Sequence, residues 1–308
     1  MDYTIDVIVP THGNLHLTMD CMNALYQNTS VHFHLIVVDD STDLTPLYFA
    51  GLRKERNNIT YIHSDEPYKS GNQFFNIGLS KAKTPFVATV MNSITVEPQW
   101  EIQALEIMKL YPKVGVIGFK CLFPNIGIYD GRIEHAGIKM VPTDTVDFSK
   151  FLSVATDTVE VARDAVSYWR SISTHCPCDI GKGSPSHWFS LSGPVEAVQW
   201  AFALLRKEAV VGNLDETLFH GFKGWDDIDN CFAVRKAGWE IFYCGTGVGI
   251  HTPRATRADN SEDANQQNIQ NAHVFFKRWG FWRNGNQPQP AQAGLNRAQR
   301  RKAVRAKK

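Results

Sequence analysis

The sequence lacks any run of about 18 apolar residues, the length that a membrane-spanning helix requires. It also lacks the basic segment and apolar stretch of a signal peptide, because Met1, Asp2 and Tyr3 lead directly into a short apolar segment. These two absences predict a cytoplasmic protein with no transmembrane segment. Hydrophobic residues make up 43% of the 308 residues and charged residues 20%, which is typical of a globular protein with a sizeable core.

Cysteine is scarce and poorly spaced for metal binding. The chain has six cysteines, and only Cys176 and Cys178 lie close together in sequence. A structural zinc site needs a second pair of ligands at a similar spacing, and the sequence has no such pair. We therefore expect reduced thiols and no zinc site.

Acidic residues are missing from the last part of the chain. Residues 291–308 contain seven basic side chains and no acidic ones, so the formal charge of +1 conceals a mildly acidic body and a basic arm. A linker rich in Pro and Gln precedes the arm at 285–290. We expect the arm to be disordered. It either contacts phosphates on nucleic acid or an anionic membrane surface, or it is a solvated tail that contacts nothing specific.

The N-terminal part has the pattern of an α/β fold. Residues 4–10 and 33–38 are short apolar runs typical of buried strands, and residues 15–28 between them have apolar positions at helical spacing. This order indicates a βαβ unit with a parallel sheet. Ligands bind beyond the carboxyl ends of such strands, where the polar segments 11–13 and 39–40 fall. The first of these loops has one glycine and no lysine or arginine, which argues against the triphosphate-binding loop of a nucleotidyltransferase.

The same alternation continues along the chain. We expect strands at 59–62, 86–91, 114–119 and 240–243, and helices at 72–82, 98–110, 158–172, about 226–237 and a last one ending at 279. The segment 181–186, rich in Gly, Ser and Pro, is predicted to be a loop, either mobile over the site or simply on the surface. His251 is predicted to lie in a loop after the last strand.

Three groups of side chains are candidates for chemistry. Asp39 and Asp40 follow a strand, where a carboxylate can accept hydrogen bonds from a nucleobase or ribose, although acidic residues there are often only turn formers. The acidic segment 226–229 opens a helix, where the helix dipole favours carboxylates, and one of these can also act as a base in a closed cleft. His251 follows a strand, where an imidazole can bind a metal or a phosphate.

Seven segments, in the same order, resemble the motifs of the family 2 glycosyltransferases, a group of inverting enzymes with the GT-A fold. They are VIVPT at 7–11, LIVVDDSTD at 35–43, the segment from Gly71 to Gly78 with Asn72 and Asn76, NLDE at 213–216, the segment 226–239 with DDID, Arg235 and AGW, His251, and FKRW at 276–279. The resemblance covers roughly residues 4–280. It implies a GT-A type α/β fold, with a Rossmann-like, mostly parallel sheet flanked by helices. It also implies a nucleotide-sugar-binding half at 1–120, an acceptor-binding and catalytic half at 121–284, and a linker with a basic tail at 285–308.

The resemblance implies a role for each matching residue. Asp227 would be the general base that takes a proton from the acceptor hydroxyl as this oxygen attacks the anomeric carbon in line. Trp225, Asp226 and Asp229 would contact the acceptor or the sugar. The donor, by default in this family a UDP-sugar, would be bound by Pro10, Thr11, His12, Asp39, Asp40, Gly71, Asn72, Asn76, Asn92 and Ser93.

One motif departs from the family pattern. The fourth strand normally ends in a DxD or NND motif, whose carboxylate binds a divalent cation (Mn or Mg), followed by PxW. Pro98 and Trp100 are retained here, but Ser93 occupies the carboxylate position. Either the cation is held by His251 and the phosphates, or basic or hydroxyl groups replace it, or the protein is a catalytically silent nucleotide-sugar-binding protein. The presence of Asp227 favours the first two interpretations.

These motifs do not select the acceptor. The basic arm at 291–308 suits a polyanion, such as nucleic acid with hydroxylated bases in modified DNA. A bacterial surface polysaccharide is the commoner acceptor for enzymes of this kind, and a small molecule or a protein also fits the sequence.

Overall fold

The computed structural model describes residues 4–126, 130–145, 170–210, 212, 214–219, 224–252 and 262–283. The helix expected at 158–172 lies almost entirely outside these residues. Asn213, the linker at 285–290 and the basic arm at 291–308 also lie outside them. Among the helices that the structure describes, none combines the length and the apolar character needed to cross a membrane.

Four N-terminal strands form the parallel half of a ten-stranded sheet. In the order β3-β2-β1-β4 they are β3 (Ile59–His63), β2 (His32–Asp39), β1 (Thr4–Thr11) and β4 (Phe86–Val90). They are connected in turn by the helices α1 (Leu15–Asn28), α2 (Thr45–Glu55) and α3 (Gly71–Lys81). Most of β1 and β2 is buried on both faces, which explains why the sequence shows continuous apolar runs there.

The sheet continues without a break into the C-terminal part. Strand β11 (Phe202–Arg206) lies antiparallel between β4 and β6 (Val114–Leu122), and β12 (Glu240–His251) is parallel to β6. β6 and β12 therefore have the same direction as β1 to β4, which confirms the expected mostly parallel sheet. Shorter strands pair at its margins: β5 (Ile94–Val96) and β10 (Gly193–Pro194) with β12, and β7 (Ile133–His135) with β6. A separate two-stranded sheet contains β8 (Ile138–Pro142) and β9 (His175–Asp179).

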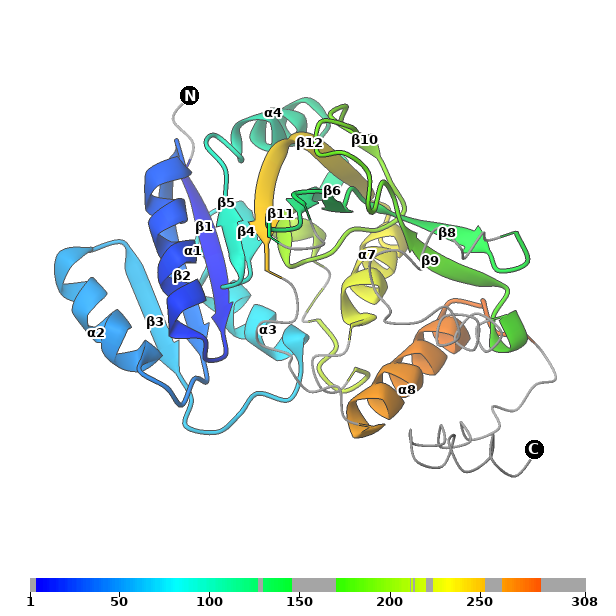
Figure 1. The fold of residues 1–308 in the computed structure, drawn as a ribbon, viewed down its shortest axis with the longest axis horizontal. Coiled ribbons are helices and arrows are strands. Elements are labelled where there is room, and N and C mark those ends of the chain that lie inside the picture. Colours follow the sequence, from blue (N-terminus) through cyan, green and yellow to red (C-terminus); the bar gives the residue numbers. More distant parts are fainter. Residues whose placement is uncertain are drawn as a thin grey trace, which may run out of the picture.

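Helices cover both faces of the main sheet, so the molecule has three layers (Figure 1). One face is covered by α1, α2 and α4 (Ile102–Leu110), and the other by α3, α7 (Asp226–Lys236) and α8 (Glu262–Arg278). Neighbouring residues of a strand point to opposite faces. Val7 accordingly packs in one core with Leu25 of α1, while Ile8 packs in the other with Phe74 of α3.

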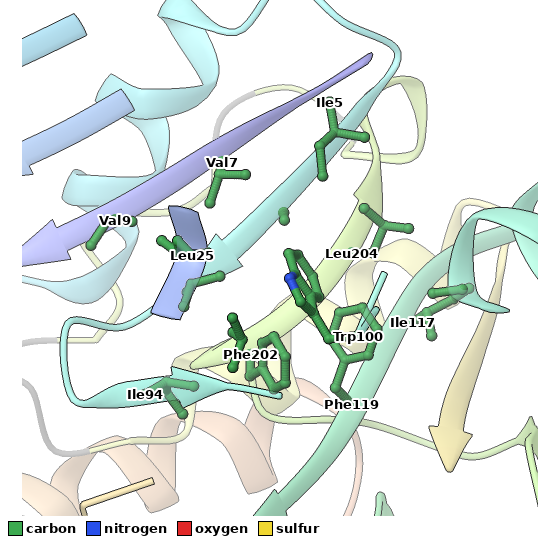
Figure 2. Packing of buried hydrophobic residues seen from close by; sticks show 14 of the residues in the cluster. Ile5, Val7, Val9, Leu25, Ile94, Trp100, Ile117, Phe119, Phe202 and Leu204 are labelled. Atoms are coloured by element: carbon green, nitrogen blue, oxygen red, sulfur yellow. The ribbon is translucent and has the colours of Figure 1, made fainter. Parts of the chain in front are cut away.

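Trp100 organises the first of these cores. Its ring lies 5.1 Å from that of Phe119 and 5.3 Å from that of Phe202, and these two rings are 4.4 Å apart (Figure 2). Its indole N–H donates a 3.1 Å hydrogen bond to the hydroxyl of Thr29, so the buried polar group is satisfied. The PxW segment therefore anchors the end of β5 to α1 and to the central strands.

Most predicted elements are confirmed, and α1 begins and ends where the sequence predicts. The helix expected from residue 98 begins only at Ile102, and the sequence analysis does not predict α2, β5 or β7 to β11.

The prediction for His251 is wrong, because this residue is the last one of β12 and not part of a loop. The preceding glycines are strand residues that packing requires. A Cβ on Gly247 would collide with Phe119, and one on Gly249 would lie 2.8 Å from Cε1 of Phe202.

Candidate functional site

The carboxyl ends of β1, β2 and β3 carry a closed group of polar side chains around Asp39. This buried carboxylate accepts hydrogen bonds from the hydroxyls of Thr11 (2.6 Å), Tyr61 (2.6 Å) and Ser41, and its Oδ2 lies 2.9 Å from Nδ1 of His63. Both of its oxygens are thus occupied by the protein's own groups. We call this group the strand-end cluster and define it as Thr11, His12, Asp39, Asp40, Ser41, Tyr61 and His63.

Asp40 continues the cluster and is also buried. Its Oδ1 lies 2.7 Å from Nδ1 of His12, and its Oδ2 accepts the N–H of Tyr68 at 2.8 Å. The hydrogen bond to Asp40 raises the pKa of His12 above its ordinary value; burial opposes this shift, and the charges of Asp40, Asp39 and Asp43 add to it. His12 is therefore favoured as a cation. Because its side chain is 49% exposed, it can face a bound anion such as a phosphate.

Asn72 and Asn76 on α3 make internal hydrogen bonds to the C-terminal part of the chain. Asn76 bonds both the N–H and the carbonyl of Leu214, at 2.8 and 2.7 Å. Asn72 donates to the carbonyl of Asp215 at 2.9 Å and accepts from the amide of Asn230 at 2.8 Å. These contacts fix the segment 214–216 and α7 against α3. They give a structural reason why the motif at 71–78 occurs together with the motif segments at 214–216 and 226–239.

Glycines at the start and middle of α3 permit two close approaches. A Cβ on Gly78 would lie 2.6 Å from Cγ2 of Ile8, so only glycine allows α3 to lie this close to β1. A Cβ on Gly71 would lie 2.7 Å from Oδ2 of Asp226. The first turn of α3 therefore lies directly against the first turn of α7.

Asn92 and Ser93 follow β4 but have different surroundings. Asn92 is buried and donates to the carbonyl of Gly13 at 3.1 Å and to the hydroxyl of Thr18 at 3.0 Å, so it fixes the loop after β1. Pro10 lies buried within β1. Ser93, in contrast, lines a cavity of about 380 Å³.

This cavity brings together four residues that the sequence singles out, namely Ser93, Trp225, Asp227 and His251. They come from the end of β4, from the start of α7 and from the end of β12. The remaining lining consists of Met91, Glu134, Ile138, Pro177, Asp179, Gln199, Ala201, Gly224 and Ile228. The described lining thus contains three carboxylates and one imidazole, and neither lysine nor arginine.

The three aspartates at the start of α7 have different surroundings. Asp229 accepts hydrogen bonds from Arg278 at 3.0 Å and from the indole of Trp279 at 2.7 Å, and burial raises its pKa against the effect of these partners. Asp226 is buried beside the start of α3. Of the three, Asp227 is the one that lines the cavity. Its position in the first helical turn favours the ionised carboxylate.

Trp225 precedes α7 with a backbone φ of 77°, in the left-handed region that bulky residues rarely adopt. Its ring packs 5.5 Å from that of Phe275 and 5.1 Å from that of Phe276, both on α8. Such a conformation persists only where the surrounding packing holds it, and it is frequent at functional sites. It sets the direction in which α7 begins and thereby the position of Asp227.

Two carboxylate–imidazole pairs in the cavity wall are missed by the sequence analysis. Oε2 of Glu134 lies 2.6 Å from Nδ1 of His251, and Oδ1 of Asp179 lies 2.9 Å from Nδ1 of His135. Burial would raise the pKa of Asp179, but the hydrogen bond from His135 and the charge of Lys182 outweigh it and hold the pKa below the usual value. The one signal in the sequence is the polar pair Glu134-His135 beside apolar residues. Its partners are 117 and 44 positions away.

No preformed cage for a metal ion is present in the part of the chain that the structure describes. There, no three His, Cys, Asp or Glu side chains lie close enough together to hold one. Ser93 offers only a neutral hydroxyl, and the strand-end carboxylates are occupied. His251, paired through Nδ1 with a carboxylate, has the arrangement typical of a metal-binding histidine. A cation would thus have one histidine ligand from this wall and would need further oxygens from a ligand.

Comparison with known families gives one match. Residues 6–125 match the model of glycosyl transferase family 2. This span contains most of β1 and all of β2 to β6, and therefore the strand-end cluster and Ser93. A comparison with curated proteins finds no similar sequence.

Comparison with solved structures finds the same fold in several glycosyltransferases. The mannosyltransferase PcManGT from Pyrobaculum calidifontis, in complex with GDP-Man and Mn²⁺, has a TM-score of 0.54 at 16% identity, over 93% of this chain and 66% of that one. GalNAc-T7 with UDP, GalNAc and Mn²⁺ has a TM-score of 0.58 at 10% identity, over 90% of this chain and 50% of that one. S. aureus TarS 1–349 has a TM-score of 0.50 at 15% identity, over 89% of this chain and 72% of that one. This chain thus spans just under two thirds of the first protein and half of the second.

Proposed function

Because residues 6–125 match the model of glycosyl transferase family 2 and the chain has the GT-A fold, we propose that this protein is an inverting glycosyltransferase. It moves a sugar from a nucleoside-diphosphate sugar to an acceptor hydroxyl, with Asp227 as the general base. One observation carries the proposal: Asp227 opens α7 and lines a cavity of about 380 Å³ together with Trp225, Ser93 and His251.

The proposed reaction uses these positions as follows. The acceptor oxygen attacks the anomeric carbon from the side opposite the nucleotide, and Asp227 takes its proton. A carbon–oxygen bond to the acceptor forms while the bond to the diphosphate breaks, so the nucleoside diphosphate leaves and the configuration is inverted. A positioned base of this kind contributes about 10²- to 10⁴-fold to a rate. Trp225 offers an apolar ring face on which a sugar can stack.

The donor is assigned to the other edge of the site. The strand-end cluster, with the cation-favouring His12, lies at the carboxyl ends of parallel strands, where nucleotides bind in open α/β sheets. The PcManGT complex contains GDP-Man and the GalNAc-T7 complex contains UDP. We take a UDP-sugar as the default donor and a GDP-sugar as the next choice.

A divalent cation, Mn²⁺ or Mg²⁺, fits this donor. Both complexes contain Mn²⁺, and His251 with its carboxylate partner suits such an ion. When bound, the cation would neutralise charge on the leaving diphosphate. Ser93 is the observation that favours the alternative function, a catalytically silent nucleotide-sugar-binding protein, because it removes the usual carboxylate ligand.

The charge of the cavity favours a neutral acceptor. Glu134 and Asp227 would repel an anionic group, and the described lining itself contains no lysine or arginine; the third carboxylate, Asp179, is paired with Lys182. A hydroxyl-rich polysaccharide fits this lining better than the phosphates of DNA.

The DNA hypothesis depends on the basic arm at 291–308, outside the described residues. Binding of duplex DNA at low and moderate salt, with and without the arm, tests it: binding that is absent or independent of the arm rejects it.

The proposal is tested with a panel of nucleotide sugars, each with and without Mn²⁺. A donor at a hundred times its Kd should stabilise the protein by about 2.7 kcal/mol, which is visible as a higher Tm. The same donor, mixed with neutral oligosaccharides, should release nucleoside diphosphate. Binding without release, for every acceptor, would support the silent binding protein. No shift with any donor would contradict both functions.

A further inference from the structure

The pair formed by Glu134 and His251 is one of two largely buried carboxylate–imidazole pairs in the cavity wall. Their side chains are 9% and 16% exposed, and Oε2 of Glu134 lies 2.6 Å from Nδ1 of His251. Hydrogen bonds to a charged group strengthen in such surroundings, because little water competes for them. The pair therefore holds the imidazole in one orientation.

The sheet places this pair beside Ser93. His251 pairs with Ile94 in the register of β12 and β5, and the N–H of Thr252 donates to the carbonyl of Ser93 at 3.0 Å. Glu134 reaches the same wall from β7, where the residues on either side of it, Ile133 and His135, pair with β6. The shift in register between these pairs lies at Glu134, where an irregular strand can turn a side chain inward.

The second pair of the wall has a different use. His135 is 1% exposed, and its Nε2 accepts weakly from the N–H groups of Gly137 and Gln199, both at 3.3 Å, while its Nδ1 binds Asp179. Both ring nitrogens of His135 are therefore occupied. Within the described residues, Nδ1 of His251 binds Glu134, whereas its Nε2 has no protein partner.

We propose that Glu134 is the positioning residue of a divalent-cation site in which His251 is the protein ligand. Glu134 accepts a hydrogen bond from the Nδ1–H of His251, which leaves the lone pair of Nε2 as the ligand atom. It also supplies, in the same cavity lining as Ser93, a negative charge that this serine lacks. The remaining ligands are oxygens of the donor diphosphate. This inference rests on the proposed function, because it requires a nucleoside diphosphate in the site.

Other carboxylates are less suited to this role. Asp39 and Asp40 are occupied by hydrogen bonds in the strand-end cluster, and Asp229 is bound by α8. Asp179 lies in the cavity wall, but it is held by His135 and Lys182. Glu134 is the carboxylate that contacts the histidine next to Ser93.

Binding of Mn²⁺ to the full chain tests the inference without any turnover. Free Mn²⁺ is followed by its electron paramagnetic resonance signal during titration, in the presence of saturating UDP or GDP. Glu134→Gln keeps the shape of the side chain and removes its charge, and we expect Mn²⁺ affinity to fall about 10- to 100-fold. His251→Asn should weaken binding at least as much. Asp179→Asn is the matched control, because it removes a carboxylate from the same wall, and it should leave Mn²⁺ affinity within about twofold.

A second variant separates a loss of charge from a loss of structure. Ser93→Asp added to Glu134→Gln returns a carboxylate to the same cavity lining, and we expect it to restore most of the Mn²⁺ affinity. The inference is overturned if the wild type binds no Mn²⁺ with either nucleotide, if Glu134→Gln binds it as tightly as the wild type, or if Asp179→Asn weakens it equally. Thermal shifts by UDP or GDP without Mn²⁺ test the donor site separately. If those shifts persist while the Mn²⁺ prediction fails, the proposed function stands and the cation site does not.

Discussion

Two regions of this molecule contain several carboxylates, and they differ in whether these carboxylates line a cavity. In the strand-end cluster, Asp39 is fully buried and both of its oxygens bind side chains of neighbouring strands. In the cavity, Glu134, Asp179 and Asp227 line an open volume of about 380 Å³. The first region uses its charge to hold strands together. In the second, Glu134 and Asp179 are paired with histidines of the wall, whereas Asp227 lines the cavity at the start of α7. An acidic residue at a strand end is thus not by itself a sign of a ligand site.

The largest expected effect is on turnover, and it should arise in the cavity alone. Asp227→Asn removes the base and keeps the shape of the side chain, so we expect the transfer rate to fall about 10²- to 10⁴-fold. Donor binding, measured by thermal shift, should stay within about twofold. A variant that retains the wild-type rate would show that another group takes the proton.

The converse effect is expected in the strand-end cluster. In the wild type, the Asp39 carboxylate accepts hydrogen bonds from three hydroxyls and one imidazole. Asp39→Asn places an amide N–H group, a donor, against these donors. We therefore expect the free energy of unfolding to fall by about 2–4 kcal/mol. Urea unfolding of this variant and of Asp227→Asn provides the comparison. Equal losses of stability in the two variants would remove the distinction between the regions.

Asp179 should make the stability of the cavity wall depend on acid pH. Its pKa is held below the usual value, so its stabilising contribution is complete above its unfolded-state pKa of about 3.9 and is lost as the pH falls through the folded-state value. We expect Asp179→Asn to lose about 1 kcal/mol at neutral pH and to show a flatter acid limb. Unfolding measured between pH 7 and the acid limb checks this, and an unchanged acid limb would contradict it.

His12 should make stability depend on pH in the opposite direction to Asp179, and its contribution should be the smallest of those predicted here. Its pKa is raised, so the contribution of the His12–Asp40 pair is complete below about pH 6.5 and is lost as the pH rises through the folded-state pKa. Because the His12 side chain is half exposed, solvent screening keeps this contribution below about 1 kcal/mol. Comparison of the wild type with His12→Gln across this range is the measurement. A difference that grows with rising pH would contradict the assignment.

The sequence predicts the N-terminal elements well for a physical reason. Strands buried on both faces must be continuous apolar runs, and α1 has a regular apolar face, so its bounds follow from local spacing. Helix α2 is missed because Thr45 and Pro46 follow a polar turn and few of its residues are buried. Local patterns do not carry enough information where burial is slight.

The site is predicted less completely than the fold. Asp227, Trp225, Ser93 and His251 follow from motifs, and the cavity brings them together. Glu134 and Asp179 lie on strands of three and five residues, and their partners are far away in sequence. Such pairs result from long-range strand pairing, which spacing along the chain does not encode.

Strand β11 has a consequence for dividing this protein into pieces. It is inserted antiparallel between β4 and β6, although it follows them by about eighty residues or more. A fragment limited to the family-matching segment 6–125 would therefore leave two unpaired strand edges facing each other across a gap. Exposed edges of this kind promote aggregation. The unit that can be expressed, crystallised or recombined with a relative is thus the whole sheet, even though the recognisable family segment ends near its middle.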